Sequence, residues 1–195
     1  MHQVINREKI AKGILGITFV MIVLLAVIRC IYVNLQYPNP TIQTITRGNI
    51  LSIGNYEISL TDWKWGNGEI ILSVYPGYHW LEIDGKEYPV EKERVGLAKL
   101  TIHKVKKDET SLDLSEISFS SGAWGNQFDL ELFYKLNPDL NDLRLKLSEN
   151  ETVEVTFPMT MVDFQFSKKS WKHIDDRKFY IVVQYYPEKK QLLCN

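Results

Sequence analysis

The side chains of this chain that could do chemistry are few and scattered. The four histidines have no second histidine or cysteine at metal-ligand spacing; they are His2, His79, His103 and His173. The densest group of possible ligands is "HIDD", with His173, Asp175 and Asp176. Two adjacent acids beside Lys172 and Arg177 are more typical of a solvated charged loop, so we expect no metal site there.

Covalent catalysis needs a serine or cysteine held at a strained turn with a base in reach. The chain has no GxSxG motif, and "SFSSGAWGNQ" lacks that spacing. Cys194 is the penultimate residue, a poor place for a positioned nucleophile because chain ends fray. No phosphate loop or GxGxxG motif occurs. We therefore predict a protein that is not an enzyme and needs no cofactor.

Aromatic residues on glycine-bearing turns are the remaining candidates for a binding site. "YPGYHW" places Tyr75, Tyr78, His79 and Trp80 around a Pro-Gly turn, and "SGAWGN" places Trp124 between two turns. Exposed aromatic side chains on loops commonly hold a sugar ring or a protein partner. These five residues are the predicted ligand- or partner-binding residues, and packing of Trp80 into a core is the alternative.

Trp63 and Trp65 differ from the loop aromatics because they fall at a period of two within a predicted strand. Side chains at this spacing share one face, so both are expected to point the same way. We predict that this pair fills the core.

Strand signals dominate the chain after residue 40. "NILSIGNYEISLTDWKWGNGEIILSVY" predicts a three-stranded meander with glycine-containing turns, and Asp84-Gly85 predicts a hairpin. Further strands are expected at residues 97–105, 111–120, 128–136, 152–157, 162–166 and 179–186. Residues 137–150 predict either a helical turn opened by Asn137 or a loop leading to a strand at 143–147. Many short strands favour an antiparallel β-sandwich.

Residues 13–33 contain 21 residues of which only Arg29 is charged, enough for a helix to cross a membrane. Cleavage as a signal peptide is not expected, since "LAVI" lacks an Ala-x-Ala arrangement. Arg29 before Cys30 also excludes a lipoprotein attachment site. We predict an uncleaved anchor in the lipid bilayer with the amino terminus in the cytoplasm, and interface residues Lys9, Lys12, Arg29 and Tyr32.

These signals divide the chain into a cytoplasmic tail (1–12), a transmembrane helix (13–33), a short stalk (34–45) and an extracytoplasmic β-sandwich (46–195). The chain has 23 basic and 24 acidic side chains, but four basic residues and only one acid lie within the first 33. The remainder is mildly acidic, which argues against a nucleic-acid partner. Cys30 and Cys194 are expected to be free thiols.

"TRGNILSIGNYEISLTDWKW", residues 46–65, resembles the opening strands of immunoglobulin-like extracytoplasmic domains that Gram-positive bacteria display on a single amino-terminal anchor. The paired cysteines around a tryptophan that mark true immunoglobulin domains are absent. The resemblance implies an adhesion, sensing or accessory role. The expected function is binding of an envelope or secreted protein, as a secretion or transport accessory or in toxin immunity. The alternative is a cell-wall glycan binder that uses the loop aromatics.

Overall fold

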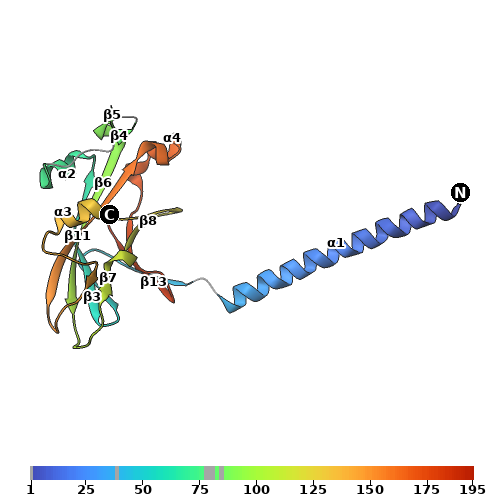
Figure 1. Cartoon of the computed structure of the whole chain (residues 1–195), viewed down its shortest axis with the longest axis horizontal. Coiled ribbons are helices and arrows are strands. Elements are labelled where there is room, and N and C mark those ends of the chain that lie inside the picture. Colours follow the sequence, from blue (N-terminus) through green and yellow to red (C-terminus); the bar gives the residue numbers. More distant parts are fainter. Residues whose placement is uncertain (1, 38–39, 77–81, 84–85) are drawn as a thin grey trace. The chain divides into compact units, whose positions relative to one another are not determined.

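The computed structural model describes residues 2–37, 40–76, 82–83 and 86–195 (Figure 1). It divides into two compact units, Met1–Pro40 and Thr41–Asn195. The first unit contains one helix, α1 (His2–Gln36). Its segment Lys12–Gln36 is 25 residues long and contains an 18-residue stretch with a mean hydropathy of 2.8, so it is long and apolar enough to cross a membrane. The helix therefore extends beyond both ends of the predicted span.

The predicted interface residues lie along α1. Lys12, Arg29 and Tyr32 have exposed side chains, and the Arg29 guanidinium lies 5.9 Å from the centre of the Tyr32 ring. The side chain of Lys9 lies outside the described part of the structure. The Arg29–Tyr32 pair fits an interfacial position, because both side chains carry an apolar body and a polar tip.

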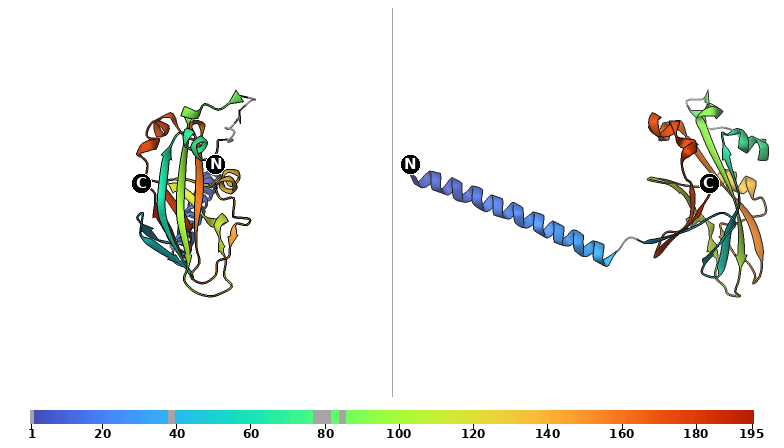
Figure 2. Two further views of the ribbon diagram at one scale, coloured as in Figure 1. Left: turned by 90° about the vertical axis from the view of Figure 1, so that its left-hand side faces the viewer. Right: turned by 180° about the vertical axis from the view of Figure 1, so that it is seen from behind.

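The second unit is built on two sheets that pack face to face (Figures 1 and 2). The five-stranded sheet has the order β1 (Thr41–Ile45), β13 (Glu188–Leu193), β12 (Tyr180–Gln184), β8 (Ser118–Ser121) and β9 (Trp124–Gln127). The four-stranded sheet has the order β11 (Thr152–Val162), β6 (Glu93–Lys104), β3 (Tyr56–Gly66) and β2 (Ile50–Ile53). The predicted antiparallel sandwich, preceded by an apolar helix, is confirmed.

Two small sheets and short helices complete this unit. The pairs are β10 (Arg144–Leu145) with β7 (Leu112–Asp113), and β4 (Glu82–Ile83) with β5 (Lys86–Glu87). The helices are α2 (Glu69–Val74), α3 (Leu130–Leu136) and α4 (Lys168–Lys172). The 3₁₀ turns are η1 (Val90–Lys92), η2 (Leu114–Glu116), η3 (Asp163–Gln165) and η4 (Ile174–Asp176). Strands β4 and β5 flank Asp84-Gly85, as the hairpin prediction requires.

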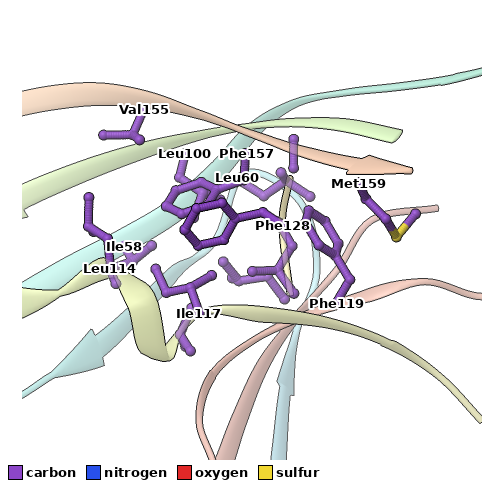
Figure 3. Close-up of a cluster of buried hydrophobic side chains, with 14 of the residues drawn as sticks. Ile58, Leu60, Leu100, Leu114, Ile117, Phe119, Phe128, Val155, Phe157 and Met159 are labelled. Carbon is purple, nitrogen blue, oxygen red and sulfur yellow. The ribbon is translucent and has the colours of Figure 1, made fainter. Parts of the chain in front are cut away.

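The core lies between the two large sheets (Figure 3). Leu60 and Leu100 of the four-stranded sheet and Phe119 of the five-stranded sheet are fully buried. Leu114 of η2 joins them from the side. Each such side chain contributes roughly 1.5–3 kcal/mol when removed from water. The core therefore depends on the alternation of apolar residues that the sequence displays.

A β-bulge in β3 changes which residues face the core. The register with β6 shifts between Leu60 and Asp62, so Thr61 is the extra residue. Even-numbered residues such as Leu60 face inward before the bulge, and odd-numbered Trp63 and Trp65 do so after it. Both tryptophans are half-buried against the core, as predicted for the pair.

The sandwich begins at Thr41, five residues earlier than predicted. Residues 41–45, placed in the stalk by the sequence, form β1, which pairs in parallel with β13. It is the one parallel pairing among the described strands. Ile45 is half-buried against the core, and β-branched residues favour extended backbone, so the segment pairs once a partner strand is present. The two prolines that precede residues 41–45 are typical of a linker, which is why the sequence predicted a stalk there.

The strand predicted at residues 128–136 is wrong, because this segment forms α3. Asp129 caps the helix by accepting a hydrogen bond from the Leu132 N–H at 3.0 Å. Leu132 and Phe133 are the buried residues of the helix, whereas Leu130, which a strand would place on the same face as Leu132, is 50% exposed. Asn137 ends this helix rather than opening one. Its amide instead pairs with Thr156 at the edge of β11.

Three other strand predictions also fail locally. Residues 162–166 form mainly the turn η3, and the third strand of the meander is replaced by α2. The predicted strand at 111–120 is divided by η2 into β7 and β8. In each case the short apolar run fits the period of a strand as well as that of a helix, and tertiary contacts determine which of the two forms.

Candidate functional site at the helical end of the sandwich

One end of the sandwich carries two long connections. Residues 67–92 join β3 to β6 and include α2, β4, β5 and η1, while residues 163–179 join β11 to β12 and include α4 (Figure 1). Glu93 of β6 pairs with Val162 of β11, so both connections meet the same end of the four-stranded sheet. We call this region the helical end. Tyr75, one of the predicted binding residues, lies in the first of these connections.

Glu93 is a buried acid at this end, with 2% of its surface exposed. Within the described part of the chain its Oε2 atom has no hydrogen-bond partner. Burial, together with the nearby Asp129 carboxylate, raises the pKa of Glu93 to about 7. A buried acid whose pKa is raised in this way can hold its proton closer to neutral pH and donate a hydrogen bond, and such groups gather at functional sites.

Tyr88 and Asp163 link the two connections. The Tyr88 hydroxyl donates a hydrogen bond to Asp163 Oδ1, and the Lys92 ammonium lies 4.0 Å from Oδ2 of the same carboxylate. Burial and the Asp163 carboxylate raise the pKa of Tyr88 to about 12, so the phenol stays a neutral donor. The ring of Phe164 meets Tyr88 edge-on at 5.8 Å and is 62% exposed. A large apolar ring is thus held at the surface by a fixed polar pair.

Arg94 connects the strand to η4 and α4. Its guanidinium contacts both carboxylate oxygens of Asp175, at 2.8 and 3.2 Å, and lies 5.7 Å from the centre of the Trp171 ring. Trp65 Nε1 donates to Asp175 at 3.0 Å. These hydrogen bonds, led by that from Arg94, lower the pKa of Asp175. The arrangement fixes η4 and α4 against β3 and β6 by bidentate geometry.

The tryptophan cluster beneath this surface depends on Gly96. Trp63 and Trp65 stack with ring centres 6.0 Å apart and an interplanar angle of 15°. A Cβ atom on Gly96 would lie 2.2 Å from the Trp63 ring, so only glycine leaves room for it. Trp63 Nε1 is buried with no hydrogen-bond partner among the described residues. Close ring packing, and not hydrogen bonding, therefore positions this tryptophan.

Two of the five predicted binding residues, Tyr75 and Trp124, are described by the structure, and these two do not lie together. Trp124 is half-buried with Phe166 at 6.1 Å and Phe179 edge-on at 6.4 Å, on the core side of the four-stranded sheet. Tyr75 packs with Val95 and its neighbours on the other face of that sheet, under the Lys135 ammonium at 5.5 Å. Tyr78, His79 and Trp80 lie outside the described residues.

The "HIDD" segment forms η4 and serves the arginine contact. The Asp175 carboxylate accepts hydrogen bonds from Arg94 and Trp65, and His173 Nδ1 lies 3.2 Å from Asp176 Oδ2. Across the ranges that the structure describes, no three His, Cys, Asp or Glu side chains gather in a way that would hold a metal ion. The described residues of the helical end are joined by hydrogen bonds, ion pairs and aromatic contacts.

Sequence reasoning missed Glu93, Arg94 and Phe164. A signal for the first two was present in "ERVGLAKLTI", where a charged pair opens an otherwise apolar strand. Glu93 shares the face of Val95 and Leu97, which α2 and α3 cover, and Arg94 takes the face toward the core. No local pattern marked Phe164, because its exposure depends on the turn η3.

Comparison with known proteins identifies a family. Residues 77–190 match a domain of unknown function, DUF5028, and since the match covers more than half of the chain, the chain belongs to this family. No curated protein matches.

Two similar solved structures are a conserved hypothetical protein from Bacillus anthracis and an uncharacterised β-sandwich protein from Clostridium difficile 630. The first has 11% identity and a TM-score of 0.46, covering 75% of this chain and 93% of the other. The second has 13% identity and a TM-score of 0.44, covering 80% and 96%.

Proposed function

We propose that this member of the DUF5028 family is a non-catalytic, membrane-anchored module whose sandwich binds another protein outside the cell membrane. Secretion or transport accessory roles and toxin immunity are the activities that suit such a module. The proposal has two parts, the anchor and the binding surface, which can be tested separately.

The anchor is supported by the composition of α1. The 25 residues Lys12–Gln36 form a continuous helix that is apolar on all sides and has no buried face within its own unit. Arg7, Lys9 and Lys12 precede the apolar run, and basic residues favour the cytoplasmic side of a membrane. This distribution favours an outer position for the sandwich.

The binding surface is supported by one observation above all, the exposed Phe164 ring held edge-on against Tyr88. Large aromatic side chains and arginine dominate the binding energy of many protein interfaces. Here Arg94 and Trp171 contact each other beside η4, and Asp175 fixes the position of the arginine. A pre-positioned aromatic surface loses little conformational freedom when a partner binds.

The anchor is tested by thiol labelling of intact cells. Lys169 is exposed on α4, so a Lys169→Cys chain in a Cys30→Ser background should react with a membrane-impermeant maleimide. Cys194 is buried, and burial raises the pKa of its thiol to about 12, so it should stay unlabelled. Labelling that appears only after lysis would place the sandwich in the cytoplasm and refute this half of the proposal.

The binding surface is tested by photo-crosslinking in the native cells. Phe164→p-benzoylphenylalanine should give a discrete protein adduct, and the matched variant at Ile50, an exposed residue of β2, should not. Equal adducts at both positions, or none at 164, would exclude this surface as the site.

The glycan alternative remains a prediction. A chain that is retained by isolated wall polymer, with retention lost on Trp124→Ala, would replace the protein-partner proposal. The packing of Trp124 between Phe166 and Phe179 argues against this outcome, because both rings already contact it.

A further inference from the structure

The turn between β12 and β13 exposes two aromatic rings away from the helical end. Tyr185 is 51% exposed and Tyr186 is 70% exposed. On the neighbouring strand β1, Ile42 is 64% exposed and pairs with Lys189, whose ammonium lies 5.8 Å from the centre of the Tyr185 ring. We call these four residues, Ile42, Tyr185, Tyr186 and Lys189, the aromatic corner.

The aromatic corner is held in place by its neighbours. Ser118 Oγ and the Tyr185 hydroxyl form a hydrogen bond at 2.7 Å, which fixes the ring on the outer face of the five-stranded sheet. The Lys190 ammonium donates to the Ser52 carbonyl oxygen at 2.7 Å and ties β13 to β2. The exposed rings therefore lie on a turn that hydrogen bonds hold in position, so the fold itself keeps them exposed.

The composition of the corner matches the headgroup region of a bilayer. Tyrosine is enriched at membrane interfaces because its ring is apolar and its hydroxyl is polar. Lysine reaches toward phosphate groups while its carbon chain stays on apolar surface. Ile42 supplies a purely apolar side chain beside them.

The corner also lies where the chain enters the sandwich. Thr41, the first residue of β1, pairs with Glu188, the residue after the Tyr186-Pro187 turn. Residues 37–40 are all that separates Gln36, the last residue of α1, from Thr41. At about 3.8 Å per residue this connection spans at most about 20 Å when fully extended. The corner thus lies beside the first strand of the sandwich, which follows α1 in the chain after this short connection.

We infer that the aromatic corner docks on the lipid headgroups of the membrane in which α1 is anchored. This inference rests on the proposed anchor. It leaves the helical end, which is formed by other connections of the sandwich, free to meet a partner. The predicted result is a sandwich with a preferred orientation on the bilayer, set by Tyr185, Tyr186 and Ile42.

Nitroxide accessibility in nanodiscs tests this orientation with the full chain. Labels are attached at Tyr186→Cys and, in a separate variant, at Ile42→Cys, both in the Cys30→Ser background. Lys169→Cys on α4 is the matched control at the helical end. The nanodiscs contain phosphatidylcholine with a minority of phosphatidylglycerol. We expect a several-fold lower collision rate with a water-soluble nickel complex, and a higher one with oxygen, at 186 and 42 than at 169.

The outcomes separate this inference from the anchor itself. A chain that does not co-purify with nanodiscs refutes both. A chain that co-purifies but shows equal nickel accessibility at 42, 186 and 169 refutes the docking and keeps the anchor. Protection at 186 that appears only when soluble wall-glycan fragments are added would also overturn the docking, because it would make the corner a sugar site.

Discussion

Strand β6 buries a charged side chain at each of its ends, and the surroundings of the two differ. Lys104, the last residue, is 1% exposed, and its ammonium contacts Asp108 at 2.7 Å, the Thr110 carbonyl oxygen at 2.7 Å and the Tyr56 hydroxyl at 3.2 Å. The hydrogen bond from Lys104 leads the contacts that lower the pKa of Asp108. Glu93, the first residue, has a carboxylate oxygen without a partner among the described residues.

The difference lies in how completely the polar atoms of the two buried side chains are paired. Buried charges are tolerated when every donor and acceptor is paired, as at Lys104. A buried acid without a full set of partners lowers stability, and retaining one is typical of sites that bind or switch. The comparison supports the proposal that the helical end binds a partner.

The largest expected effect is the loss of the Lys104 network. Lys104→Met should destabilise the sandwich more than a substitution at Glu93, Gly96 or Asp175, because it leaves the Asp108 carboxylate and the Thr110 carbonyl without their buried donor. Urea unfolding of the full chain in detergent, followed by tryptophan fluorescence, measures the effect. The control is Lys99→Met, since Lys99 forms an exposed pair with Glu154. Equal unfolding midpoints for Lys104→Met and Lys99→Met would show that the buried Lys104 network adds no more stability than an exposed ion pair. The two ends of β6 would then not differ in the way described above.

The next effect is a pH dependence from Glu93. Its pKa is raised to about 7 in the folded state, above an unfolded value near 4.5. The folded state therefore holds the proton more tightly, and this contribution is complete below the unfolded pKa and lost as the pH rises through about 7. The free energy of unfolding should fall between pH 5 and pH 8, by about 3 kcal/mol at most.

Glu93→Gln should remove this slope and stabilise the chain at pH 8, because a neutral amide replaces a buried carboxylate. Glu154→Gln, at an exposed position of β11, should leave the slope unchanged. A wild-type chain whose stability is flat from pH 5 to 8 would show that Glu93 is solvated or paired in solution.

A smaller effect is expected near the start of β6, at Gly96. Gly96→Ala would place a methyl group against the Trp63 ring, and overpacking of this kind costs about 1–3 kcal/mol. Because Trp63 packs on Phe179 near the helical end, the change should also weaken partner crosslinking at Phe164. Gly125→Ala is the matched control, since its Cβ would lie an ordinary 3.6 Å from the nearest atom. An unfolding midpoint of Gly96→Ala equal to that of the wild-type chain would mean that the tryptophans rearrange freely around the added methyl group.

The sequence predicted the sandwich and the apolar helix because both follow from periodicity and composition. It located the long strands β6 and β11 and the core position of Trp63 and Trp65. It failed at α3, where the spacing of Phe128, Leu130 and Leu132 satisfied a strand face as well as a helix. The helical end could not be predicted, since Arg94 meets Asp175, and Tyr88 meets Asp163 and Phe164, only through contacts between segments far apart in the chain.

The smallest effect concerns the exposed ion pair beside the buried acid. Asp175→Asn removes one partner of Arg94 and one acceptor of Trp65, but the Asp175 side chain is 58% exposed, so the cost should be about 1 kcal/mol or less. The loss should shrink further at high salt, because screening weakens exposed pairs and leaves buried ones almost unchanged. Comparing the midpoint shifts of Asp175→Asn and Lys104→Met at low and high salt measures this. The contrary outcome is a loss of stability that does not depend on salt and is as large as that of Lys104→Met. It would show that the arginine contact is as buried in solution as the Lys104 network. Both ends of β6 would then contribute to stability in the same way.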